Sequence, residues 1–206
     1  MSNFSIQNNE VDHLMLKYEF ALEELITQLK ISIKEFEFNN NKQIVEHIKT
    51  RIKSKESAIK KLDSKGYEIN IDNLKNHIHD MVGVRIVCSF LPDVYDIVNI
   101  IDNAKNLKIK EKRDYIETPK KSGYSSYHII VEVPIYLEKG IEYIEAEIQI
   151  RTMAMDFWAS LDHKLQYKFS DVIPEEVKKE MYDCSLAIKR LDNKMLGLHE
   201  IVNKYK

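Results

Sequence analysis

Glycine, proline and cysteine are all scarce in this sequence. Its 206 residues include five Gly, four Pro and two Cys, so the chain is not a collagen, a low-complexity segment or a disulfide scaffold. A charge excess is also missing, because 31 Lys and Arg residues oppose 33 Asp and Glu residues for a net charge of -2. The 44% of hydrophobic residues can build a substantial core, and we expect a single domain over residues 1–206, or one domain with appended helices.

Long apolar runs are missing as well. No uncharged stretch approaches the roughly 18 to 20 residues of a membrane-spanning helix. Residues 1–6 have neither the basic region nor the apolar core of a secretion signal. We therefore expect a cytoplasmic protein. Cys88 and Cys184 lie far apart, without CxxC spacing or a His at ligand spacing, which predicts two reduced core thiols rather than a metal-thiolate site.

The first third of the chain has the periodicity of helices. Apolar residues recur every three or four positions over residues 11–36. After consecutive Asn residues, a similar period continues over residues 44–62 and stops before Gly66. We predict N-terminal helices over about residues 11–65.

The middle of the chain is typical of a mixed sheet. Residues 81–90 form a short β-branched apolar run, and Pro92 can then open a helix to about residue 104. A helical pattern also covers residues 152 to about 169. These elements predict an α+β fold in which a mixed β-sheet, over about residues 77–170, is flanked by helices. Further strand candidates cover residues 107–115, 124–135 and 141–151.

The C-terminal part predicts one long helix over about residues 174–204. Its apolar positions repeat in steps of four and three, the spacing of a heptad seam. The seam can pack against the N-terminal helix of the same chain, or it can pair helices between subunits. The seam positions are Val177, Met181, Cys184, Ile188, Leu191, Met195, Leu198 and Val202.

Four clusters of polar residues are candidates for chemistry, and the first is basic. If residues 53–61 are helical, one face carries Lys53, Ser57, Lys60 and Lys61. Such a face could neutralise several phosphates at once. A Lys-rich helix alone is more often a solvated charged face.

The second cluster surrounds Asp80, at the start of the strand candidate that contains Gly83 and Arg85. A carboxylate at a sheet rim can hold Mg²⁺, and the Gly lets a ligand approach the backbone closely. In a regular strand, the Arg85 side chain would lie on the opposite face from Asp80. An isolated Asp at a strand start is more often a turn or cap residue.

The third cluster combines aromatic and basic residues. A period of two puts Tyr124, Ser126 and His128 on one strand face, and Arg113 and Lys120 precede them in the chain. A stacking ring, an imidazole and nearby cations would suit a nucleotide. The alternative is an edge strand that carries a pair of Tyr residues.

The fourth cluster lies on the last strand candidate. Glu147, Gln149 and Arg151 share one face, and the Ile residues between them share the other. Glu147 and Asp80 would together form a carboxylate pair for Mg²⁺, the common means of handling a polyphosphate leaving group. Exposed strands rich in carboxylates are common, so this cluster alone does not decide the function.

The order and spacing of these clusters resemble a known family. Asp-x-x-Gly-x-Arg, Lys-x-x-Gly-Tyr-x-Ser-x-His and Glu-Ile-Gln-Ile-Arg-Thr follow the basic segment, as in the synthetase domain of the RelA/SpoT homologues, which make the alarmones ppGpp and pppGpp. The chain length and residues 154–163 resemble a small alarmone synthetase of the RelQ type. The resemblance covers about residues 14–200. It implies a nucleotidyltransferase-like fold and a GTP diphosphokinase of the stringent response, which transfers the β,γ-pyrophosphate of ATP to the 3′-hydroxyl of GDP or GTP with Mg²⁺.

The resemblance also implies residue roles. Asp80 would be the principal Mg²⁺ ligand, and Glu147 either the second ligand or the base that accepts the 3′-hydroxyl proton. Gln149 would orient the acceptor ribose. The residues implied for ATP are Arg51 and Arg85 around the adenine, and Lys53, Ser57 and Lys61 at the phosphates. The residues implied for the acceptor are Tyr124 stacked on guanine, Arg113, Lys120 and His128 at its phosphates, and Asp156 at the guanine edge.

Three departures from the family pattern affect these expectations. The family usually has Asn at the position of Asp156, and an ionised Asp can accept from guanine N1 and N2 but cannot donate to O6. Ser125 stands where an Arg is common. RelQ-type tetramers bind alarmone in a cleft with an aromatic residue and a Thr, where this chain has His47 and Lys49. We expect a homotetramer from the heptad seam, but alarmone activation does not carry over.

Two alternatives compete with this function. A related enzyme could transfer pyrophosphate to another acceptor, such as the 3′ end of tRNA, although the net charge of -2 argues against it. The protein could instead be a non-catalytic regulator that binds nucleotides or RNA. The presence of Asp80, Glu147, Lys53 and Tyr124 argues against lost chemistry. Single-stranded RNA is a further candidate as a regulator of the enzyme.

Overall fold

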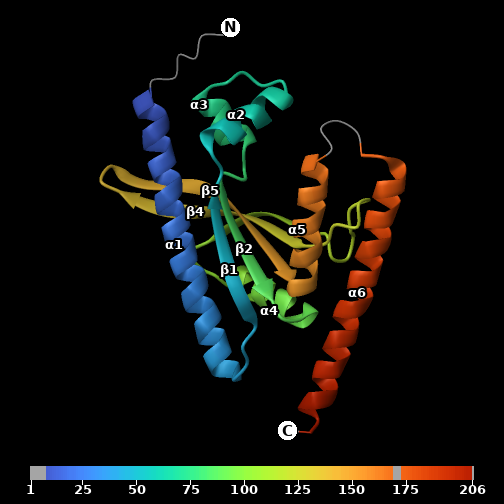
Figure 1. Cartoon of the computed structure of the whole chain (residues 1–206). Coiled ribbons are helices and arrows are strands. Elements are labelled where there is room, and N and C mark those ends of the chain that lie inside the picture. Colours follow the sequence, from blue (N-terminus) through green and yellow to red (C-terminus); the bar gives the residue numbers. More distant parts are fainter. Residues whose placement is uncertain (1–7, 169–172, 206) are drawn as a thin grey trace.

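A five-stranded mixed sheet forms the centre of the structure (Figure 1). The computed structural model describes residues 8–168 and 173–205. Neighbouring strands follow the order β1-β2-β5-β4-β3; β2 and β5 are parallel, and the other neighbours are antiparallel. The predicted mixed sheet with flanking helices is therefore confirmed. The strands are β1 (Val45–Ile52), β2 (Val82–Cys88), β3 (Lys108–Asp114), β4 (Tyr127–Leu137) and β5 (Gly140–Thr152).

The helices are arranged around the sheet in three groups. Helices α1 and α4 pack on one face of the sheet and touch each other. Helices α5 and α6 pack together on the other side from α1, and α2 and α3 lie side by side near the start of β2 (Figure 1). None of the helices in the described ranges is long and apolar enough to cross a membrane. The helices are α1 (Asn8–Asn40), α2 (Lys55–Ser64), α3 (Ile71–His77), α4 (Leu91–Asp102), α5 (Met153–Lys168) and α6 (Glu175–Asn203).

The core lies between the sheet and helices α1 and α4. The apolar stripe predicted over residues 11–36 faces the sheet, and Leu25 and Leu29 within it are buried. Along β5, alternate residues such as Ile148 and Ile150 are fully buried in the same cluster. Because side chains alternate across a strand, the residues between them face the opposite side of the sheet.

The predicted helix over residues 44–62 is wrong in its first half. Residues Val45–Ile52 form the edge strand β1, which pairs antiparallel with β2. The misleading signal was the spacing of Ile44, Ile48 and Ile52, because steps of four fit one face of a strand as well as one face of a helix. The helix α2 begins only after Ser54, whose side chain accepts a hydrogen bond from the backbone N–H of Ser57.

The C-terminal helix has the predicted length but not the predicted partner within the chain. α6 packs against α5 and touches α4, on the other side of the molecule from α1 (Figure 1). Met181 is buried, whereas Leu191, Met195 and Leu198 are exposed. The seam is therefore only partly covered by its own chain. Cys184 on α6 is exposed rather than a core thiol, while Cys88 is buried as predicted, and both are free.

Candidate active site

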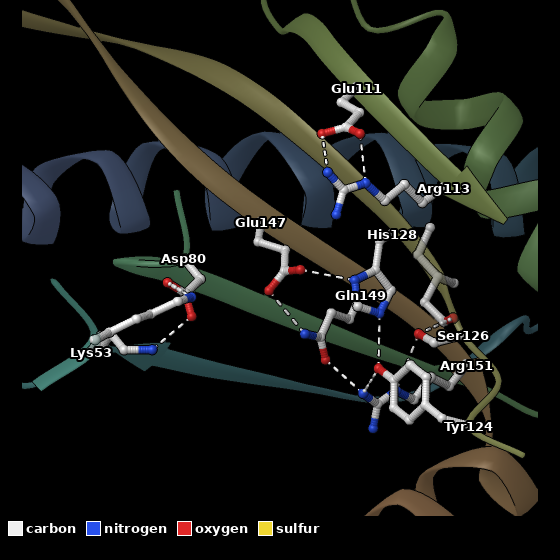
Figure 2. A network of polar contacts seen from close by, with 12 residues as sticks. Lys53, Asp80, Glu111, Arg113, Tyr124, Ser126, His128, Glu147, Gln149 and Arg151 are labelled. Carbon is white, nitrogen blue, oxygen red and sulfur yellow. Dashed lines mark hydrogen bonds and ion pairs between the residues drawn. The ribbon is translucent and has the colours of Figure 1, made fainter. Parts of the chain in front are cut away.

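The polar clusters meet on the face of the sheet that points away from α1. Strand register places Gly83 beside Glu147, Arg85 beside Gln149, and His128 beside Gln149 on the next strand. Directly paired residues project from the same face of a sheet. The clusters that the sequence places on separate strands therefore form one site (Figure 2).

Asp80 lies in the turn before β2 and is held by two lysines. Lys53 Nζ contacts Oδ2 at 2.7 Å, and Lys61 Nζ contacts Oδ1 at 2.9 Å. Burial raises the pKa of Asp80, but hydrogen bonds from the two ammonium groups and their charges outweigh it and lower the pKa below its usual value. Asp80 is therefore ionised at neutral pH.

Glu147 belongs to a closed ring of side chains (Figure 2). Its Oε1 lies 2.8 Å from His128 Nδ1, and His128 Nε2 lies 2.8 Å from the Tyr124 hydroxyl. Arg151 Nη2 donates to the Tyr124 hydroxyl at 2.5 Å and to Gln149 Oε1 at 2.7 Å. Gln149 Nε2 donates to Glu147 Oε2 at 2.9 Å, which closes the ring.

The ring keeps Glu147 ionised and orients its neighbours. Burial raises the pKa of Glu147, but the hydrogen bonds from His128 and Gln149 outweigh it and lower the pKa below its usual value. All five members are satisfied when His128 donates from Nδ1 to Glu147 and accepts at Nε2 from the Tyr124 hydroxyl. Burial also lowers the pKa of Arg151 and raises that of Tyr124. A change at one member therefore alters hydrogen bonds around the whole ring.

Two cavities flank the carboxylate pair. Asp80 and Glu147 line both of them. The first cavity, of about 380 Å³, is lined also by Lys49, Thr50, Arg51, Lys53, Gly83, Val84, Arg85 and Gln149. The second, of about 250 Å³, is lined also by Lys61, Lys65, His77, His79, Glu111, Arg113, His128 and Ile130. Both cavities are rich in cations, so each is suited to a phosphorylated molecule.

The structure brings together most, but not all, of the residues predicted for nucleotide binding. Arg113 lines the second cavity, where Glu111 accepts from its Nε at 2.5 Å and from Nη2 at 2.8 Å. Lys120 lies over the Tyr124 ring, 4.9 Å from its centroid. Ser57 lies in the first turn of α2 and lines neither cavity. Tyr124 itself lies in the loop before β4, not on the strand.

One sequence prediction about the second cluster is wrong. Arg85 and Asp80 were expected on opposite faces, but both line the first cavity. The reason is that β2 begins at Val82, so Asp80 lies outside the strand and the alternation does not reach it. Arg51 on β1 lines the same cavity, which gives it two guanidinium groups on neighbouring strands.

Asp156, in the first turn of α5, is buried among cations. Its Oδ1 accepts from Arg85 Nη1 at 3.1 Å and from Arg151 Nη1 at 3.3 Å, and its Oδ2 lies 3.7 Å from Lys49 Nζ. Strand alternation predicts the correct face for Arg151 but gives this residue no role. In the sequence, Lys49 stands out only as a departure from the family pattern. Pairing of these residues depends on where α5 meets β1 and β2, which no local sequence pattern shows.

Comparison with known proteins identifies the family. A family model described as a region found in RelA / SpoT proteins matches residues 50–172. The chain belongs to the RelA/SpoT family. The GTP pyrophosphokinase YwaC of Bacillus subtilis (strain 168) is 45% identical over 189 residues, which cover 92% of this chain and 90% of that relative.

Solved structures of family members have the same fold. The crystal structure of small alarmone synthetase 2 from Bacillus subtilis is 44% identical, with a TM-score of 0.83, covering 92% of this chain and 97% of that one. Small alarmone synthetase 1 from the same organism, bound to its product pppGpp, is 33% identical with a TM-score of 0.85, covering 95% and 99% of the two chains. The family resemblance stated from the motifs is thus confirmed over nearly the whole chain.

Proposed function

We propose that this protein is a GTP pyrophosphokinase that transfers the β,γ-pyrophosphate of ATP to the 3′-hydroxyl of GDP or GTP and so makes ppGpp or pppGpp. The observation that carries the proposal is that two cation-rich cavities meet at Asp80 and Glu147. A transferase for two nucleotides needs a site for each, with the reacting groups at their junction. The relative YwaC is named as a GTP pyrophosphokinase, and the structure of small alarmone synthetase 1 contains pppGpp.

The first cavity is the proposed ATP site. Arg51 and Arg85 project into it from neighbouring strands, and planar guanidinium groups stack well on a purine. Lys53 lines this cavity, and Lys61 reaches Asp80 from the lining of the second one, so both are placed near the junction of the cavities to bind the phosphates as mobile point charges. Ser57 would join them from the start of α2, where backbone N–H groups and the helix dipole favour an anion.

The carboxylate pair fits a divalent metal ion, and we propose Mg²⁺. Asp80 and Glu147 are both ionised, since the pKa of each is lowered, and they face the same two cavities. Among the described residues, no group of three or more His, Cys, Asp or Glu side chains is arranged to hold a metal ion. That suits Mg²⁺, which is commonly held by one or two carboxylates together with water and substrate phosphates. Bound there, the ion would neutralise charge on the transferred phosphates.

The second cavity and the ring supply the acceptor chemistry. In the transfer, the 3′-oxygen forms a bond to the β-phosphorus while the bond from that phosphorus to the α-phosphate oxygen breaks and AMP leaves. The 3′-hydroxyl proton passes to Glu147, which the ring holds ionised and oriented. Gln149 beside it is placed to bind the ribose.

Aromatic and cationic groups would bind the rest of the acceptor. Tyr124 would stack on guanine, and Lys120 beside its ring would contact the phosphates with His128. Arg113 would bind the same phosphates. To do so, its guanidinium group must release the Glu111 carboxylate and donate to phosphate oxygens instead.

A direct assay tests the reaction. Purified protein is incubated with Mg²⁺, ATP labelled at the γ-phosphate, and GMP, GDP or GTP in turn, and the nucleotides are separated by anion exchange. We expect label on a guanosine 3′-pyrophosphate together with an equal amount of AMP. Label that appears only on inorganic phosphate or pyrophosphate, or no transfer to any of these acceptors, would refute the proposal. The GMP, GDP and GTP rates also rank the acceptors.

We further propose that the chain forms a homotetramer. The C-terminal half of α6 carries an exposed apolar stripe that includes Leu191, Met195, Leu198 and Val202. Burial of such a stripe favours helix pairing between subunits. Light scattering coupled to size exclusion measures the mass directly, and a monomer at working concentration would contradict this. Regulation by single-stranded RNA remains a prediction from the family resemblance.

A further inference from the structure

We propose that Asp156 is a positioning residue that links the ATP site to the acceptor site, and that it does not read the guanine edge. Its carboxylate holds Arg85, which lines the ATP cavity, and Arg151, which belongs to the ring around Glu147. The inference rests on the proposed function for the identity of the two nucleotides. It concerns one buried group that contacts both sites.

The position of the carboxylate is suited to this role. The residue is 7% exposed, and its Oδ1 accepts from both guanidinium groups at 3.1 and 3.3 Å. Lys49 Nζ lies 3.7 Å from the other oxygen. A carboxylate that reads N1 and N2 of guanine must present both oxygens to the ligand. Here both oxygens face protein cations.

Charge balance makes the contact important for the two arginines. Arg151 is 3% exposed, and the positive charge of Arg85 acts on it unfavourably while Asp156 acts favourably. Two guanidinium groups that share one buried carboxylate are stabilised by it, and removal of that carboxylate leaves their charges uncompensated. Without it, we expect Arg85 and Arg151 to move apart.

Movement of the two arginines would change both the ATP site and the acceptor site. Arg85 Nε is buried and has no hydrogen-bond partner among the described residues, so the bond from Arg85 Nη1 to Asp156 is a principal constraint on how the guanidinium lies in the ATP cavity. Arg151 also donates to the Tyr124 hydroxyl and to Gln149. A displaced Arg151 therefore disturbs the residues that hold the acceptor. If Asp156 instead read the guanine edge, its substitution would weaken binding of the acceptor alone.

Two measurements on the purified full chain separate these roles. The variant Asp156→Asn keeps the size of the side chain and removes its charge, and Asp183→Asn makes the same change at an exposed position on α6. Calorimetry measures binding of AMPCPP, the ATP analogue whose α,β-methylene group blocks transfer. Kinetics with GDP and with IDP, which lacks the 2-amino group, measure how strongly the base edge is recognised.

We expect Asp156→Asn to weaken AMPCPP binding about tenfold, because the amide oxygen can still accept from the guanidinium groups but no longer compensates their charge, at a cost similar to that of one hydrogen bond to a charged group. The KM for GDP should also rise, while the preference for GDP over IDP in kcat/KM stays as in the wild type. Asp183→Asn should change none of these values. Wild-type affinity for AMPCPP in Asp156→Asn, or loss of the preference for GDP over IDP, would overturn the proposal.

A second variant keeps the test decisive if Asp156→Asn does not fold. Asp156→Glu retains the charge but displaces it by one methylene, so it should weaken AMPCPP and GDP binding together and by less than the Asn variant. Weakened GDP binding with unchanged AMPCPP binding would overturn the proposal. For this variant, calorimetry measures the binding of both AMPCPP and GDP, so neither measurement requires turnover. A wild-type protein that binds both nucleotides but makes no alarmone would therefore refute the proposed function without confusing the result for Asp156.

Discussion

The Tyr124 hydroxyl offers a sharp test of the ring around Glu147. Tyr124→Phe keeps the aromatic face and removes the one atom that joins His128 to Arg151. If the hydroxyl orients the ring and the aromatic face binds guanine, the Phe variant should lower kcat and leave the acceptor KM nearly unchanged. Tyr124→Ala removes both features and should also raise the acceptor KM.

The size of the effect follows from the contacts. Arg151 Nη2 donates to the hydroxyl at 2.5 Å, and Arg151 is 3% exposed, so water cannot readily replace the lost acceptor. A hydrogen bond to a charged group contributes about 1.5–3 kcal/mol. If that energy is felt in the transition state, kcat falls about 10- to 150-fold. Loss of stacking in the Ala variant costs about 1–3 kcal/mol more, which appears as a higher acceptor KM.

The assay is alarmone formation at saturating ATP with GDP varied, compared across the wild type and both variants. Tyr136→Phe, which removes an exposed hydroxyl from β4, the strand that follows the Tyr124 loop, is the matched control and should behave as the wild type. A Phe variant with normal kcat would show that the ring is not needed for transfer. A Phe variant whose acceptor KM rises as much as that of the Ala variant would show that the hydroxyl, not the ring face, binds the acceptor.

Three further changes test other parts of the site. Asp80→Asn and Glu147→Gln each remove a charge without changing volume and should abolish transfer while circular dichroism stays native; normal turnover in either variant would remove that residue from the metal site. Because the pKa of folded Asp80 is lowered, its ionised form stabilises the fold above its unfolded pKa, and this is lost as pH falls through the folded value. The Tm advantage of the wild type over Asp80→Asn should therefore shrink in acid, and a pH-independent difference would contradict this. Gly123→Ala should raise the acceptor KM, because a Cβ there would meet the Ser185 Cβ at 2.5 Å and push the Tyr124 loop off α6; Gly66→Ala, with a similar positive φ but open space, is the control for backbone strain alone.

The part of the site that could be predicted from sequence is the part that depends on strand alternation. Glu147, Gln149 and Arg151 follow one another at every second position, and β5 is regular through all three. Their shared face, and the burial of the Ile residues between them, therefore followed from local geometry alone. The motifs then pointed to the family, which the comparisons confirm.

The errors have a common physical origin, which is that local periodicity does not show where an element begins or what it packs against. Ile44, Ile48 and Ile52 fit a helix and a strand equally well, and the pairing with β2 decides for the strand. Asp80 stands two residues before β2, so the alternation rule could not place it relative to Arg85. Contacts between elements that lie far apart in the sequence decide both cases, and the residue pattern of one sequence does not show these contacts.

In this site the lysines can move their charge between partners, whereas the arginines hold theirs in a fixed position. Lys53 and Lys61 reach Asp80 through flexible stems and end in single ammonium groups, so they can transfer from the carboxylate to an incoming phosphate without movement of the backbone. Arg85 and Arg151 are planar forks, tied to a buried carboxylate. The lysines thus suit groups that change charge and position during transfer, and the arginines suit flat bases and a ring that must stay in place. By this reasoning Lys53→Arg or Lys61→Arg should still bind ATP but should lower kcat, because a guanidinium group bound to two phosphate oxygens is released less easily than a single ammonium group.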